Sequence, residues 1–119
     1  MIEGRRGLLI AACLMLSGCA PAWGQAELLA VQLVGACDRV ADAAALQGAR
    51  PDQGAQAARA ARQVAEALAR PVPDGAAITV WLAVVDAALS GLSTVPALRE
   101  RVHVADAALL ALRVELVRR

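Results

Sequence analysis

The sequence predicts an all-α protein, folded as a small antiparallel helical bundle of about four helices. Alanine, which has the highest helix propensity, occupies 28 of the 101 positions from Cys19 onward, while Tyr and Phe are absent and Thr is rare. Proline and glycine divide the chain beyond residue 24 into four segments. Each segment carries apolar residues three or four positions apart, as on one face of a helix. At 119 residues, the chain is long enough for one domain and too short for two.

The first helix is predicted over residues 25–47 and the second over residues 52–70, with Asp52 as the cap of the second. The second helix has only two large apolar side chains, so we expect it to be the least firmly packed and to fray first. The expected apolar stripes are Leu29, Leu33, Cys37, Val40 and Ala44 in the first helix, widened by Leu28, Val31, Val34 and Leu46, and Ala57, Ala61, Val64 and Leu68 in the second.

The third helix is predicted over residues 76–92, after the cap Asp74, and it is apolar on nearly all sides. Its length of about 17 residues and the charge of Asp86 at its middle argue against a membrane crossing, so we interpret it as the core helix. The fourth helix is predicted to start near residues 93–96, where hydroxyl caps precede a proline. Its expected stripe is Leu98, Val102, Ala105, Leu109, Leu112 and Leu116.

The first 19 residues have the three parts of an export signal. Residues 1–6 are short and net basic, residues 7–16 are an uncharged apolar run, and two small residues and a cysteine follow. As a helix, the apolar run spans roughly 15–18 Å, well short of the roughly 30 Å of a hydrocarbon core. We therefore expect the bundle to follow a cleavable N-terminal signal helix and not a transmembrane anchor.

Leu16-Ser17-Gly18-Cys19 resembles the lipobox of bacterial lipoproteins, an aliphatic residue and two small residues before a cysteine. The resemblance covers only about the first 20 residues. It implies that Cys19 receives a diacylglycerol and becomes the first, N-acylated residue, with Leu16, Ser17 and Gly18 fitting the signal peptidase. The implied organisation is a signal peptide over 1–18, a lipidated tether over 19–26 and an Ala-rich bundle over 27–119.

The same resemblance implies a location. Residue 20 is Ala and not Asp, so the lipoprotein pattern points to the outer membrane, facing the periplasm. Two alternatives stay open. Residues 10–13 also fit the four-residue pattern, with Cys13 as the cysteine, and small residues over 20–26 would suit ordinary signal cleavage that releases a soluble protein.

Charge and motifs argue against several functions. From Cys19 onward, ten Arg balance ten acidic residues, and without Phe or Tyr this neutral chain is not expected to bind nucleic acid. No phosphate-binding glycine loop, nucleophile elbow or zinc-finger spacing occurs. We expect no cofactor beyond the covalent lipid.

Few side chains could support chemistry. Cys37 lies on an apolar stripe, which predicts a buried thiol, and the single histidine, His103, is 66 residues away. His103 with Asp106, and Asp38 with Asp42, are each one helical turn apart, but two ligands rarely make a metal site, so solvated faces are the better interpretation. For Asp86 we expect an ion pair across the bundle, with an arginine such as Arg59, Arg62 or Arg99.

These observations favour a non-enzymatic, lipid-anchored component of the bacterial envelope that binds other envelope proteins. A lysis or exclusion lipoprotein encoded by a phage or plasmid is an alternative at the same location. A periplasmic carrier of a hydrophobic ligand is the alternative of a different class. A pocket of several hundred Å³ between the third and fourth helices would favour the carrier.

Overall fold

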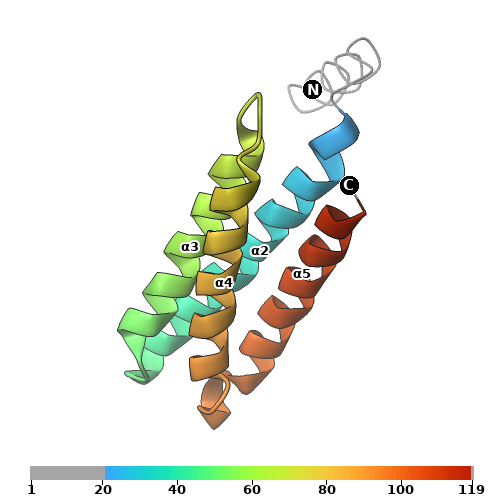
Figure 1. The fold of residues 1–119 in the computed structure, drawn as a ribbon. Helices are drawn as coiled ribbons and strands as arrows, with labels where there is room; N and C mark the ends of the chain where they lie inside the picture. The colour runs from blue at the N-terminus through green and yellow to red at the C-terminus, as the bar shows by residue number, and fades with distance from the viewer. Residues whose placement is uncertain (1–20, 119) are drawn as a thin grey trace, which may run out of the picture.

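The computed structural model describes residues 21–118, and this part of the chain is helical apart from short connections, with no strand. The elements are α2 (Pro21–Gln47), α3 (Pro51–Ala69), α4 (Gly75–Leu92), the short 3-10 helix η1 (Pro96–Leu98) and α5 (Arg99–Val117). The prediction of an all-α bundle with four main helices is confirmed (Figure 1).

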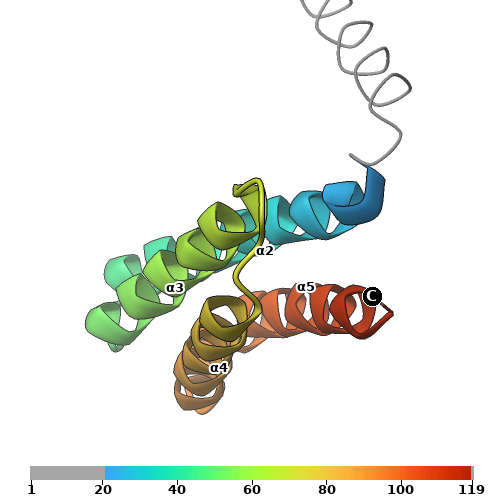
Figure 2. The same ribbon diagram turned by 45° about the horizontal axis from the view of Figure 1, so that its top comes forward.

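The helices run up and down, so chain neighbours are antiparallel. α2 packs against both α3 and α5, and α3 packs against α4, whereas α4 and α5 contact each other much less. Figure 2 shows α4 and α5 at an angle to each other, and because these two helices contact each other little, we call this the open side of the bundle. We call the end with the start of α2, the α3–α4 connection and the end of α5 the proximal end, and the opposite one the distal end (Figure 1).

α2 covers Pro21–Gln47, so the chain is already helical four residues before the predicted start. Residues 21–26, expected as tether, are therefore helical, and Ala26 is fully buried. The predicted stripe from Leu33 to Ala44 is confirmed. The predicted widening was wrong at Leu28, Val31 and Leu46, which are exposed, because alanines 26, 30, 36 and 43 take the buried positions beside the stripe.

α3 is not the loosely packed helix that was expected. It lies between α2 and α4 and buries eight residues: Gly54, Ala57, Ala58, Ala60, Ala61, Val64, Ala67 and Leu68. Small side chains let the helix axes approach closely, which compensates for the few large ones. A Cβ atom on Gly54 would lie 3.1 Å from both the Ala41 Cα and the Ala44 Cβ atoms.

The α2–α3 turn also differs from the prediction. Asp52 is in the first turn of α3 and is not its cap. Arg50 holds that position in the left-handed region, with φ 50° and ψ 54°, and Pro51 follows. The Arg50 guanidinium donates a hydrogen bond of 2.6 Å from Nη1 to the Gly91 carbonyl oxygen, which joins this turn to the end of α4.

α4 is less buried than a core helix. It packs mainly against α3, but only 33% of its residues are buried and Val80 is exposed. The buried residues are Ile78, Leu82, Val85, Ala88, Leu89 and Leu92. It borders the open side of the bundle. By length and composition alone, it is also the one helix between residues 21 and 118 that could cross a membrane, a criterion that the core helices of soluble proteins meet as well.

The helix ends are well defined around α4. The Asp74 cap is confirmed, since its carboxylate accepts a hydrogen bond of 3.1 Å from the Ala77 amide. The hydroxyls of Ser93 and Thr94 donate back to the carbonyls of Ser90 and Gly91, so they end α4 and do not cap the fourth helix as predicted. The fourth stripe is confirmed from Leu98 to Leu112 and is half-buried at Leu116.

Candidate binding pocket between α4 and α5

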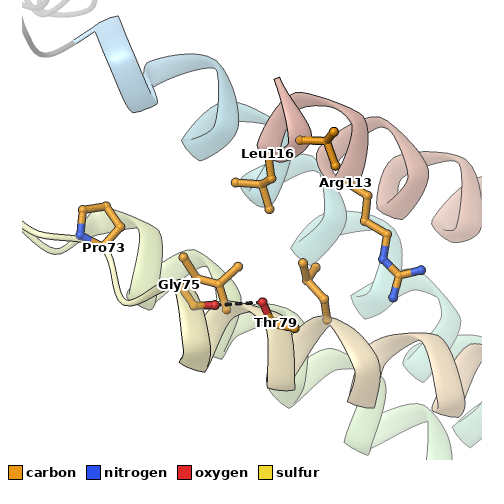
Figure 3. Close-up of a pocket in the computed structure, with 8 residues that line it drawn as sticks. Pro73, Gly75, Thr79, Arg113 and Leu116 are labelled. Carbon is orange, nitrogen blue, oxygen red and sulfur yellow. Dashed lines mark hydrogen bonds between the residues drawn. The ribbon is translucent and has the colours of Figure 1, made fainter. Parts of the chain in front are cut away.

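A pocket of about 440 Å³ lies where α4 and α5 diverge toward the proximal end (Figure 3). α4 supplies its first two turns and α5 its last two. The volume falls within the range of small-molecule sites, roughly 300–1,000 Å³. The lining residues are Pro73, Gly75, Ile78, Thr79, Leu82, Arg113, Leu116 and Val117.

The lining is mainly apolar, with one charged side chain. The Thr79 hydroxyl donates a hydrogen bond of 2.8 Å to the Gly75 carbonyl within α4. The Arg113 guanidinium forms a salt bridge of 3.7 Å with Asp86, and the two side chains are 42% and 50% exposed. A ligand with an apolar body would contact Ile78, Leu82 and Leu116, and an anionic end group could pair with Arg113.

The salt bridge confirms that Asp86 pairs with an arginine of another helix, but the partner is Arg113 and none of the three that were suggested. Arg62, one of those three, pairs instead with Asp38 at 2.6 Å and thereby links α3 to α2. A partly exposed pair of this kind stabilises a protein little. It joins α4 to α5 beside the pocket, since Arg113 also belongs to the lining.

Asp106 on α5 is the carboxyl group with a raised pKa in this region. Partial burial raises the pKa most, the negative charge of Asp86 raises it further, and His103 partly opposes both effects. The folded protein therefore holds this proton more tightly than the unfolded chain does, so ionising Asp106 costs stability.

Replacing Asp106 with Asn should remove this cost. The Asp106 contribution to the stability of the wild-type protein is greatest below the usual aspartate pKa and is lost as pH rises through the raised, folded value. The variant should therefore be the more stable protein above that window and show a flatter stability curve within it. Urea denaturation across the acidic range measures this. A wild-type protein that gains more stability than Asp106→Asn as pH rises would contradict the assignment.

Cys37 is a buried thiol, as predicted. Burial first, and then the charges of Asp38 and Asp106, raise the pKa of Cys37 to about 12. A thiol with this pKa holds almost no thiolate near neutral pH, so it lacks the reactive form of a catalytic nucleophile. His103, the base that an enzyme hypothesis would need, is exposed on α5.

The remaining candidates form no ligand set. In the described part of the chain, no three His, Cys, Asp or Glu side chains come together as a metal site would require. A second hollow of about 260 Å³, lined by Ala36, Arg39, Glu100, Arg101 and Val104, lies between α2 and α5 and is more polar. Leu16, Ser17, Gly18 and Cys19 lie outside the described residues.

Sequence reasoning had assigned no binding role to the pocket residues Thr79 and Arg113. A search for a cation within an apolar segment would have found Arg113, between Leu112 and Val114.

Comparison with known proteins gives no further indication of function. No protein family matches the chain, and no curated protein or solved structure shows significant similarity to it.

Proposed function

We propose that the protein is a lipid-anchored, non-enzymatic lipoprotein of the bacterial envelope that binds an apolar ligand between α4 and α5. The lipobox-like residues 16–19, after a basic start and an apolar run, support the anchor. The protonated state of Cys37 is consistent with a role in binding, without nucleophilic chemistry at this thiol.

The pocket is the observation that carries the ligand proposal. A bundle that serves only as a scaffold is expected to close its core, whereas α4 and α5 diverge around about 440 Å³ of largely apolar space. Such a space suits an acyl chain or a similar narrow apolar group, with Arg113 near an acidic end. This is the carrier among the functions expected from the sequence.

Filling the pocket tests the proposal. Thr79→Trp places an indole in the pocket at an exposed position, where only a hydrogen bond within α4 is lost. Titration with a fluorescent fatty acid should show saturable binding to the wild-type protein and at least about tenfold weaker binding to the variant, since a tenfold loss is only about 1.4 kcal/mol.

Ala83→Trp is the matched control, because Ala83 is exposed on α4 and does not line the pocket. It should bind the probe as the wild type does. Equal loss in both variants, or no saturable binding to the wild-type protein, would contradict the ligand proposal.

A protein partner is the second candidate, favoured by an exposed stripe on α5. Leu110, Val114 and Val117 are 63%, 52% and 85% exposed, and their spacing of four and three residues places them on one face of the helix. An apolar stripe of this kind suits docking of an amphipathic helix. A protein with this function alone would show no saturable binding of the fatty acid.

A further inference from the structure

Exposed apolar side chains are concentrated in the proximal half of the molecule. Nine large hydrophobic residues are exposed in the described part of the chain, and only Leu46 and Val104 belong to the distal half. Val72 in the α3–α4 connection and Val117 at the end of α5 are 83% and 85% exposed; both belong to the proximal end, and we call these two residues the proximal tip. Apolar side chains gathered at one end of a molecule are candidates for a contact surface.

The chain outside the described residues indicates what this surface contacts. Cys19 is two residues before Pro21, the first described residue of α2, at the same proximal end. Two residues span at most about 7 Å, so a lipid on Cys19 holds this end against the surface of a bilayer. The neutral charge of the mature chain leaves apolar contact as the source of any added affinity.

We propose that the proximal end docks on the phospholipid bilayer, with Val72 and Val117 entering the boundary between headgroups and acyl chains. The inference rests on the lipid anchor in the proposed function and adds the orientation of the bundle. Val117 also lines the α4–α5 pocket, and Pro73 of the lining is next to Val72. The pocket therefore opens at the membrane surface, where an acyl chain can enter without crossing water.

Single-cysteine labels measure this orientation. Val72→Cys, Val117→Cys and the matched control Leu46→Cys place a thiol at positions that are 83%, 85% and 88% exposed in the folded protein. Each lipidated variant is labelled with a small environment-sensitive fluorophore. It is then placed in vesicles of phosphatidylethanolamine and phosphatidylglycerol that carry a spin-labelled quencher lipid. Cys37 stays in place because it is buried, and the unsubstituted protein gives the background.

Quenching at positions 72 and 117 is expected to exceed that at position 46 by at least about threefold, since side chains in the boundary lie about 5–10 Å into it. Equal quenching at the three positions, or stronger quenching at position 46, would overturn the orientation. Tip labels that stay in water also overturn it and leave the apolar tip to a protein partner.

The intact mass of the same samples shows whether the protein carries a lipid, so it tests the anchor independently of the orientation. A mass without lipid refutes the anchor. In that case, quenching of the unlipidated protein at positions 72 and 117 with these vesicles decides whether the proximal end still docks on the bilayer. Retained quenching supports the docking surface, and its loss overturns it.

Discussion

Replacing Gly54 with leucine is expected to lower the free energy of unfolding by about 3 kcal/mol, the upper end of the usual cost of overpacking. A Cβ atom alone would lie 3.1 Å from the Ala41 Cα, a backbone atom that cannot move without its helix. The whole leucine side chain would force α2 and α3 apart and loosen the alanine contacts between them. With a total stability of about 5–15 kcal/mol typical of a domain, this is a large loss.

Gly35→Leu is the matched control, because a Cβ atom at Gly35 meets nothing within 4 Å. Leucine favours helix over glycine, so this change should raise the unfolding free energy by roughly 0.5–1 kcal/mol. Urea denaturation followed by circular dichroism at pH 7 measures both variants. If the two substitutions change stability in the same direction and by the same amount, the close approach at Gly54 is not a principal source of stability.

Local signals were enough to predict most of the helices. Prolines and glycines mark the ends within a few residues, and the spacing of Leu33, Cys37 and Val40 identified the buried face of α2. The prediction that α3 is loosely packed was wrong because it measured packing by the number of large side chains. In an alanine-rich bundle, the approach of two backbones at Gly54 and Ala41 contributes packing that such a count omits.

The same preference for small residues at the contacts explains the exposed Leu28 and Val31. Two alanines, Ala26 and Ala30, are fully buried on α2, and the larger side chains beside them face outward. Sequence periodicity treats alanine and leucine as similar apolar positions, so it could not choose between these faces. The choice depends on how closely the other helices approach.

The sequence could name the pocket as a feature to look for but could not predict that it exists, because its existence depends on the angle between α4 and α5. The apolar character of Ile78, Leu82 and Leu116 is equally consistent with a closed core. What differs is the weak contact between these two helices compared with the contacts around α3. Contacts between segments far apart in the chain determine that difference, and a single sequence does not contain them in a readable form.

Cys19→Ala is expected to abolish incorporation of labelled palmitate and to leave the signal segment uncleaved. Each buried methylene contributes about 0.8 kcal/mol to membrane affinity, so two or three acyl chains anchor the cleaved protein, whereas the variant lacks these chains and keeps only the apolar run of its signal as a membrane contact. The cysteine that the lipobox requires would also be missing, so the variant should retain residues 1–18 in its intact mass.

Cys13→Ala is the matched control, since residues 10–13 offer the other lipobox-like pattern. If Cys19 is the lipidated residue, this variant keeps its label and its membrane location, because the apolar run loses only one weakly hydrophobic thiol. Label that disappears with Cys13 and not with Cys19 would move the anchor six residues upstream and shorten the apolar run of the signal. If neither the wild-type protein nor the Cys13→Ala control incorporates label, the protein is not lipidated, and the lipid no longer gives a reason to place the pocket at a bilayer surface.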